Sequence, residues 1–223
     1  MKAALFWDID GTLLTTARAG VFSLEAALEE VSGVRGDLQG MATAGMTDYA
    51  IAEAALAAVG HATDEETVQR FLAIHGRQLP EYLHRREGRV LPGVREALED
   101  LDGDPSVRNL LLTGNTEAGA AAKLAHYGLA EFFPEGGAFC VGPGERAEIA
   151  RRALPYANGT PAFVIGDTPA DVECGKEIGA RTIAVATGSY SVDRLRETDP
   201  WAALEQLPEP GAFRELLGLG PRG

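Results

Sequence analysis

The amino-acid sequence predicts an α/β fold, in which a parallel sheet carries helices on both faces. Short apolar segments alternate with longer segments of helical periodicity along most of the chain. The apolar segments lack the alternation of a half-buried strand, which is typical of strands that are covered on both faces. One long stretch, residues 15–91, breaks this alternation, because it contains helical patterns and no convincing strand.

Five apolar segments are predicted to form the sheet. They lie at residues 3–7, 110–112, 139–141, 163–165 and 183–186. Helices are predicted between and after these segments. Their ends are marked by glycine, which often follows the last helical residue, and by proline, which often occupies the first helical position. These helices begin at Pro92-Gly93-Val94, cover residues 116–127, 145–154 and 169–178, and begin again at Asp199-Pro200.

Residues 15–91 are predicted to form an all-helical insert of three helices. The first carries Val21, Leu24, Leu28 and Val31 on one face, and the second ends at Gly60. The third begins at residue 64 and runs to about residue 86, and its internal proline at position 80 should kink or split it. We therefore predict two domains, an α/β core from residues 1–14 and 92–223 and a helical domain from residues 15–91.

The charge balance excludes some classes of partner. The chain has 223 residues, with 33 acidic and 20 basic residues and a formal charge of −13. Proteins that bind nucleic acid or an anionic membrane surface usually carry a basic face. We therefore expect no nucleic acid and no membrane as a partner, whereas a small phosphorylated ligand stays compatible with this charge.

The cysteines and the N-terminal segment indicate a cytoplasmic protein. Cys140 and Cys174 are too few and too far apart for a disulfide framework or a paired metal motif. We expect both thiols to be reduced. The apolar residues 3–7 end at an aspartate and are too short for the core of a signal peptide.

The first candidate motif follows the first strand directly. Asp8 and Asp10 are two residues apart on an extended segment, so both carboxylates project to the same side. They lie at the carboxyl end of a buried strand, where α/β proteins bind ligands. At a separation of about 5 Å and an effective dielectric near 20, their repulsion is roughly 3 kcal/mol. The pair therefore predicts a bound cation or a shared proton.

The second candidate motif ends the next strand. Thr113, Gly114 and Asn115 follow three leucines, and we expect a helix to begin just after them. The free N–H groups of a helix start bind anions, and a threonine hydroxyl can donate to a phosphate oxygen.

The third candidate motif again places acids after an apolar strand. Asp167 ends the strand at residues 163–165, and Asp171 follows one helical turn later. Carboxylates gathered in this way suit Mg²⁺, which prefers oxygen ligands.

A basic residue is needed near these acids. Arg146 heads a predicted helix, whereas Arg151 and Arg152 lie in its middle. Lys123 lies well inside the helix after Thr113, so we expect it to point away from the site. Arg146 is therefore the predicted phosphate-binding cation.

In combination these motifs resemble the haloacid dehalogenase-like hydrolase superfamily. Its members carry DxDGT, a strand that ends in Thr or Ser, a Lys or Arg, and an acidic GDxxxD segment. The matching residues here are, in order, Asp8, Asp10, Thr113, Arg146, Asp167 and Asp171. Residues 15–91 resemble the type I helical cap of phosphoglycolate phosphatase-like members, and Gly45-Met46-Thr47-Asp48 resembles a GxTD segment frequent in such caps. At Arg146 the chain departs from phosphoglycolate phosphatase itself, where that motif usually reads Lys-Pro.

The resemblance implies a Rossmann-like core and a Mg²⁺-dependent phosphatase that hydrolyses a small phosphomonoester through an aspartyl-phosphate. It implies catalysis by Asp8 and Asp10. The presence of Asp10 favours phosphoryl transfer over dehalogenation, since true dehalogenases lack the second aspartate. The implied substrate-binding residues are Thr113, Gly114, Asn115 and Arg146. The implied metal site comprises Asp8, the Asp10 main-chain carbonyl, Asp167 and, directly or indirectly, Asp171.

Two other functions stay open at this point. The same motifs serve a phosphomutase of the β-phosphoglucomutase type, and the fold can also act as a catalytically silent binding module. The expected partner is a small phosphorylated metabolite, and the protein is expected to be a monomer or a homodimer.

Overall fold

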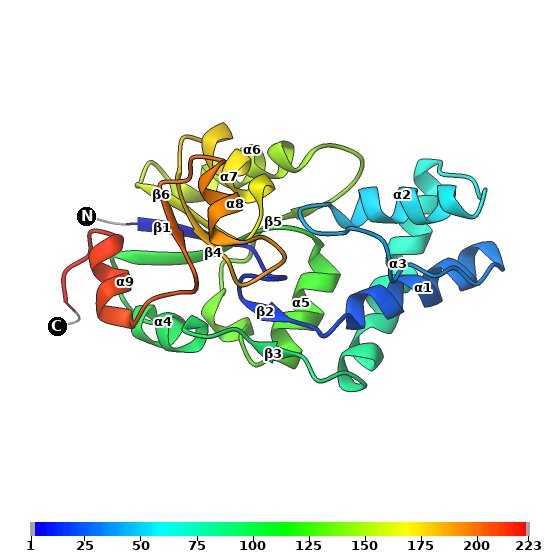
Figure 1. The fold of residues 1–223 in the computed structure, drawn as a ribbon, viewed down its shortest axis with the longest axis horizontal. Helices are drawn as coiled ribbons and strands as arrows, with labels where there is room; N and C mark the ends of the chain where they lie inside the picture. The colour runs from blue at the N-terminus through cyan, green and yellow to red at the C-terminus, as the bar shows by residue number, and fades with distance from the viewer. Residues whose placement is uncertain (1–2, 222–223) are drawn as a thin grey trace.

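The computed structural model describes residues 3–221 and contains a six-stranded parallel sheet (Figure 1). The strand order is β5-β4-β1-β6-β7-β8. The predicted α/β class is therefore confirmed. The strands are β1 (Ala3–Trp7), β4 (Val107–Thr116), β5 (Gly137–Cys140), β6 (Ala162–Gly166), β7 (Arg181–Val185) and β8 (Ala202–Leu204).

The central strand β1 shows why the strands are apolar throughout. All five of its residues are buried. Ala4 and Phe6 pack into the core on one face of the sheet, whereas Leu5 and Trp7 pack into the core on the other. Because helices cover both faces, neither set of alternating residues meets water, and the strand carries no polar alternation.

Helices cover the sheet from both sides. In Figure 1, α6 and α7 lie above the sheet and α4 and α9 lie below it. The helices outside the insert are α4 (Val94–Leu101), α5 (Glu117–His126), α6 (Arg146–Ala157), α7 (Pro169–Glu177), α8 (Val192–Arg196) and α9 (Pro210–Leu216), with a short 3₁₀ turn η1 (Ala130–Phe132). No helix among residues 3–221 has the length and apolar character needed to cross a membrane.

The insert contains three helices, α1 (Ala19–Ser32), α2 (Asp48–Ala58) and α3 (Glu65–His84). They lie beyond the carboxyl ends of the strands (Figure 1). The expectation of no strand in residues 15–91 is wrong at both ends, where β2 (Leu14–Thr15) pairs antiparallel with β3 (Arg89–Val90). Two-residue strands are defined by their backbone pairing and leave no periodic pattern in the sequence. Helix α3 also continues through Pro80 and is not split.

The predicted helix at Asp199-Pro200 is wrong, because this segment leads into the edge strand β8. A helix N-cap needs an extended backbone, whereas Asp199 has a φ of 55°. Trp201, two residues after Asp199, packs edge-on against Phe163 with ring centroids 5.7 Å apart, and the guanidinium of Arg181 lies 5.2 Å from its ring centroid. These contacts hold the segment against β7, so that its backbone extends the sheet.

Candidate active site

The sheet topology brings the predicted motifs together. Strand β1 lies between β4 and β6, and all three are parallel, so their carboxyl ends meet at one edge. Asp8 follows β1, Thr113 lies near the end of β4, and Asp167 follows β6. A cavity of about 580 Å³ lies at this edge, between the sheet and the helical insert.

Three buried carboxylates form a cluster at the floor of the cavity. One oxygen atom from each of Asp8, Asp167 and Asp171 lies within 4.8 Å of the others. Burial raises the pKa of Asp8 to about 6, against the opposing charge of Arg146. Burial, with repulsion from Asp171 and Asp8, raises the pKa of Asp167 to about 8. The cluster therefore carries more negative charge than its protein surroundings offset.

The chain closes tightly around the carboxylate of Asp167. The Thr12 hydroxyl donates to it over 3.0 Å. A Cβ atom at Gly11 or at Gly188 would lie 2.6 Å from the Asp167 carboxyl carbon, which is closer than real Cβ contacts. Gly11 also has a φ of +85°, which favours glycine. The lack of a side chain at positions 11 and 188 therefore leaves the space that the Asp167 carboxylate occupies.

Asp171 differs from the other two acids because both of its oxygens have donors. One oxygen accepts from the backbone N–H of Thr168 (3.0 Å) and from the Thr168 hydroxyl (2.7 Å), forming a capping box at the start of α7. The other accepts from Arg146 over 2.5 Å. The arrangement suits Asp171 to holding its neighbours in place, whereas Asp8 and Asp167 have oxygen atoms free for a cation.

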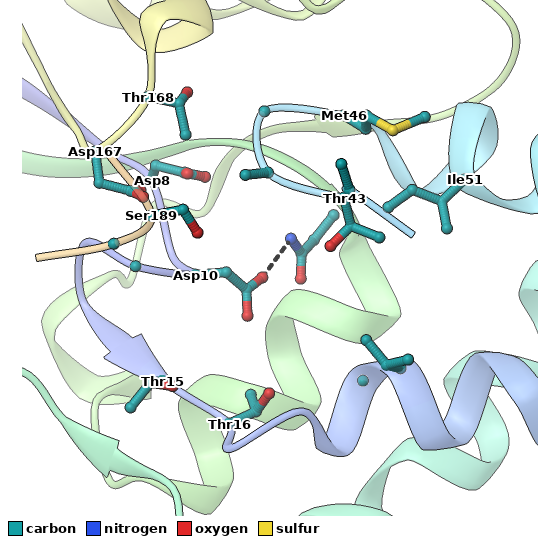
Figure 2. A pocket seen from close by; sticks show the side chains of 18 of the residues that line it. Asp8, Asp10, Thr15, Thr16, Thr43, Met46, Ile51, Asp167, Thr168 and Ser189 are labelled. Atoms are coloured by element: carbon teal, nitrogen blue, oxygen red, sulfur yellow. Dashed lines mark hydrogen bonds between the residues drawn. The ribbon is translucent and has the colours of Figure 1, made fainter. Parts of the chain in front are cut away.

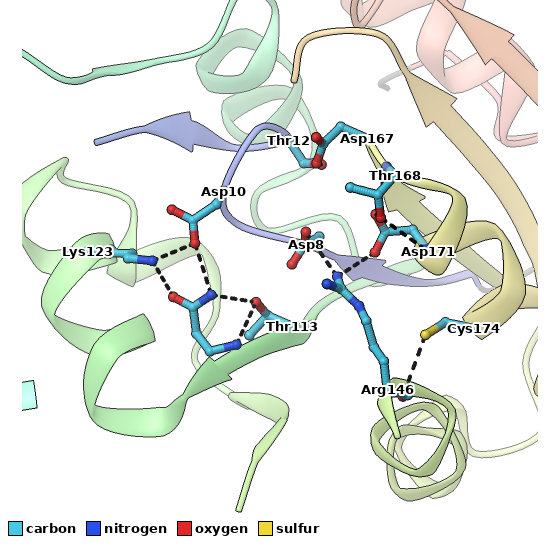
Figure 3. A network of polar contacts seen from close by, with 11 residues as sticks. Asp8, Asp10, Thr12, Thr113, Lys123, Arg146, Asp167, Thr168, Asp171 and Cys174 are labelled. Carbon is cyan, nitrogen blue, oxygen red and sulfur yellow. Dashed lines mark hydrogen bonds and ion pairs between the residues drawn. The ribbon is translucent and has the colours of Figure 1, made fainter. Parts of the chain in front are cut away.

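Arg146 occupies the position predicted for the basic residue. It is the first residue of α6, its side chain is buried, and its Nη2 lies 3.0 Å from Asp8 and 2.5 Å from Asp171 (Figure 3). Arg151 and Arg152 lie further along α6 and are exposed. Because α6 starts at the carboxyl edge of the sheet, only its first residue reaches the acids.

Lys123 also reaches the site, so the expectation that it points away is wrong. Its ammonium lies 2.5 Å from Asp10 and 2.5 Å from the Asn115 side-chain oxygen (Figure 3). Side chains on a helix tilt toward its N-terminus, and the N-terminus of α5 lies at the carboxyl edge of the sheet. The four-carbon stem therefore carries the ammonium back toward this edge, where it meets Asp10.

The contacts of Asp10 set its protonation. Burial alone would raise the pKa of Asp10, but the charge and hydrogen bond of Lys123, together with the hydrogen bond from Asn115, lower it. Asn115 Nδ2 donates to Asp10 over 2.9 Å. Asp10 is therefore turned away from the acidic cluster and held as a carboxylate on the side of α5.

The helix predicted to begin just after Asn115 is confirmed, because Thr116 caps α5 and the helix starts at Glu117. Strand β4 continues to Thr116, which caps α5, and its backbone N–H donates over 2.7 Å to Asp48 from the insert. The Thr116 N–H is therefore already bound by a side chain of the insert. Gly114 faces the insert, because a Cβ there would lie 2.5 Å from the Met46 carbonyl oxygen.

The Thr113 hydroxyl lies next to Asp8. It accepts from the backbone N–H and the side-chain amide of Asn115 over 3.3 Å and 3.2 Å. Its hydrogen bond to Asp8 lowers the pKa of Asp8, although burial dominates. Thr113 therefore keeps the place predicted for it, three residues before the cap of α5.

The sequence pattern gave no reason to place His75 in the site. The four histidines lack metal-ligand spacing and are predicted to be ordinary surface or helix residues. His75 is instead buried on α3 and lines the cavity. A usable signal was its position four residues from both Phe71 and Leu79, on the buried stripe of the helix.

Comparison with known proteins identifies relatives. A family model described as haloacid dehalogenase-like hydrolase matches residues 5–176, and a second, hydrolase-like model of the same group matches residues 146–210. The chain is 27% identical over 226 residues to a protein of Dickeya dadantii (strain 3937) named probable phosphatase IndB. That alignment covers 98% of this chain and 96% of the relative.

Solved structures share the fold over the whole chain. A predicted phosphatase from Clostridium acetobutylicum superposes with a TM-score of 0.71 at 19% identity, covering 98% of this chain and 99% of that one. A putative beta-phosphoglucomutase from Thermotoga maritima superposes with a TM-score of 0.62 at 20% identity, covering 99% and 100%. At these identities the likeness concerns the fold.

Proposed function

Because the chain belongs to the haloacid dehalogenase-like hydrolases, we propose that it hydrolyses a small phosphomonoester through an aspartyl-phosphate on Asp8. The observation that carries the proposal is the buried cluster of Asp8, Asp167 and Asp171 with Arg146 against it. Such a cluster has the charge to hold a divalent cation and a cationic side chain to meet a phosphate. The relative named a probable phosphatase supports this choice of reaction.

The cluster fits Mg²⁺. Three ionised carboxylates and one guanidinium leave two negative charges, which a divalent cation would offset. Burial, the largest cause, raises the pKa values of Asp8 and Asp167, which supports a site whose ionised form is completed by a cation. Asp8 and Asp167 would hold the ion, with the main-chain carbonyl of Asp10, and Asp171 would keep Arg146 in place. When bound, Mg²⁺ would neutralise phosphate charge.

The residues at the edge of the sheet divide the chemistry between them. The Asp8 carboxylate attacks phosphorus and the bond to the leaving oxygen breaks, so that one difficult step becomes two easier ones. Asp10 is ionised in the free site, so it must take up a proton as the substrate binds; it gives that proton to the leaving oxygen and then takes one from the water that attacks the aspartyl-phosphate. Arg146 and Thr113 bind the phosphate oxygens and stabilise the charge that develops on them.

Residues 15–91 serve in this proposal as a cap. The insert forms one wall of the cavity, and Asp48 and Met46 contact the end of β4 from that side. A closed insert excludes bulk water from the aspartyl-phosphate and selects the leaving group.

The decisive experiment is phosphate release by Asp8→Asn. Wild-type protein in millimolar Mg²⁺ is expected to release phosphate from p-nitrophenyl phosphate, and Asp8→Asn is expected to lose at least about a thousandfold in rate. Asp193→Asn, which changes an exposed aspartate of α8, is the matched control and should keep the wild-type rate. Phosphate release by Asp8→Asn at the wild-type rate would exclude the mechanism.

Product analysis separates hydrolysis from mutase action. With a sugar phosphate, the proposed hydrolase releases inorganic phosphate and free sugar in equal amounts. Exchange between phosphate isomers of that sugar without phosphate release would instead identify a phosphomutase.

A further inference from the structure

The insert side of the cavity has a chemistry different from that of the acidic floor. Its apolar lining comes from α1, α2 and the loop between them, and Figure 2 shows Met46 and Ile51 across the cavity from Asp8 and Asp167. The apolar residues are Val21, Leu24, Met41, Met46 and Ile51. The cavity volume, about 580 Å³, lies within the range of about 300–1,000 Å³ that buries a ligand much larger than a phosphate group.

His75 adds one directed polar group to this wall. The Ser23 hydroxyl donates to the His75 main-chain carbonyl over 3.1 Å, and the same hydroxyl oxygen lies 3.0 Å from His75 Nδ1. Because the hydroxyl has a single proton, Nδ1 must carry the proton of the ring and donate it to Ser23. Nε2 then carries a lone pair. Burial, assisted by the charge of Lys123, lowers the pKa of His75 to about 3, so the ring stays neutral.

The charged groups on the insert side do not suit an anionic leaving group. Asp48 is buried and lines the cavity, and the His75 lone pair also repels negative charge. The cation on this side, Arg18, is exposed and already donates to the side chain and carbonyl of Gln39 over 2.9 Å and 2.6 Å. The wall therefore offers apolar contact, the Thr43 hydroxyl and the acceptor of His75, none of which carries a charge.

We propose that the leaving group is uncharged, ring-sized and hydroxyl-bearing, and that His75 Nε2 accepts a hydrogen bond from one of its hydroxyls. The apolar residues pack against the carbon skeleton of the ring. This inference rests on the proposed phosphatase activity and names its substrate class. His75 contacts the leaving group and takes no part in phosphoryl transfer.

Matched substrate pairs test the inference on the wild-type protein. Each pair has the same ring size with and without hydroxyls: glucose 6-phosphate with cyclohexylmethyl phosphate, and ribose 5-phosphate with cyclopentylmethyl phosphate. In at least one pair, kcat/KM is expected to be about tenfold higher for the hydroxyl-bearing ester, the value of one good hydrogen bond. Its kcat/KM should also exceed that of 2-phosphoglycolate, whose leaving group carries a carboxylate.

Two substitutions at one position separate the two nitrogen atoms of His75. His75→Asn keeps a donor near the place of Nδ1 for Ser23 and loses the acceptor, whereas His75→Gln keeps an acceptor near the place of Nε2. We expect His75→Asn to abolish the hydroxyl preference and His75→Gln to retain much of it. Thermal unfolding of both variants shows whether they are folded.

A third variant tests the size of the leaving group without touching His75. Gly20 lines the cavity, and a Cβ there would meet no atom within 4 Å. Gly20→Leu fills this space from the second residue of α1. It is expected to lower kcat/KM for the ring esters at least tenfold relative to ethyl phosphate.

The failures of the two proposals are distinguishable. If 2-phosphoglycolate is the best substrate, if neither pair shows a hydroxyl preference, or if that preference survives in folded His75→Asn, this inference is wrong while the phosphatase proposal stands. If Gly20→Leu lowers all esters equally, the ring-sized leaving group is wrong. If wild-type protein releases phosphate from none of these esters or from p-nitrophenyl phosphate, the proposed function fails and this inference fails with it.

Discussion

Replacing Arg146 by methionine isolates the charge that holds the acidic cluster together. Methionine keeps an unbranched apolar stem of similar reach and removes the guanidinium. The Arg146 guanidinium lies 3.0 Å from Asp8 and 2.5 Å from Asp171, and all three side chains are almost fully buried. Its removal therefore leaves two buried carboxylates without their shared cation.

The magnitude follows from this burial. Removing one partner of a buried ion pair costs about 3–5 kcal/mol, against a total stability of about 5–15 kcal/mol for a folded domain. In a protein of this size each kcal/mol shifts the unfolding temperature by about 2–4 °C, so metal-free Arg146→Met should unfold about 6–20 °C below wild type. The deficit should narrow as the pH falls toward about 6, because Asp8 without Arg146 takes up its proton at a higher pH than in wild type, where its pKa is about 6.

The assay is thermal unfolding with and without Mg²⁺. Because the variant site carries one more uncompensated negative charge, saturating Mg²⁺ should raise its unfolding temperature more than that of wild type. Arg151→Met is the matched control: it lies on the same helix and loses an exposed ion pair with Glu177, worth about 0–1 kcal/mol. Equal shifts for the two variants, or a deficit that Mg²⁺ leaves unchanged, would refute the reasoning.

Two further predictions concern other parts of the structure. Gly188→Ala places a methyl group against the carboxylate of Asp167 and should weaken Mg²⁺ binding by about 10–100-fold, as measured by calorimetry. Gly142→Ala is the control: its methyl group would meet no atom within 4 Å, so it should leave Mg²⁺ binding unchanged. The hydrogen bonds of Ser106 and Arg214 hold the pKa of Asp104 at about 2, so this group stabilises the fold above pH 4 and loses that effect as the pH falls through 2. Asp104→Asn should therefore lower the free energy of unfolding in urea by about 1–2 kcal/mol at pH 7. That difference should shrink toward zero near pH 2, and a constant difference would contradict the assignment.

The strands at the centre of the sheet could be predicted from the sequence because burial on both faces leaves a continuous apolar run. Ala3–Trp7 and Ala162–Gly166 have this pattern. The edge strand Ala202–Leu204 is only half-buried, and its pairing with β7 depends on backbone hydrogen bonds and on the packing of Trp201. Neither is visible as a periodic pattern.

The acids of the site were predictable for a topological reason. Asp8 and Asp167 each follow a strand directly, and parallel strands place their carboxyl ends at one edge. Lys123 and His75 could not be located in this way, because they lie in the middle of helices. Their contacts with the site depend on how α5 and α3 are rotated against the core, which is decided by tertiary packing.

The contact between Asp48 and Thr116 bears on how freely the insert and the core can be exchanged between related proteins. Helix α5 belongs to the core, yet the acceptor for the N–H at its cap comes from the insert. A chimera that received a foreign insert without an aspartate at this place would leave that N–H without its partner. Gly114 adds a steric condition, because a larger residue would collide with the Met46 carbonyl. A chimera that exchanges the insert should therefore also exchange the start of α5, so that Asp48 and Met46 come from the same parent as Thr116 and Gly114.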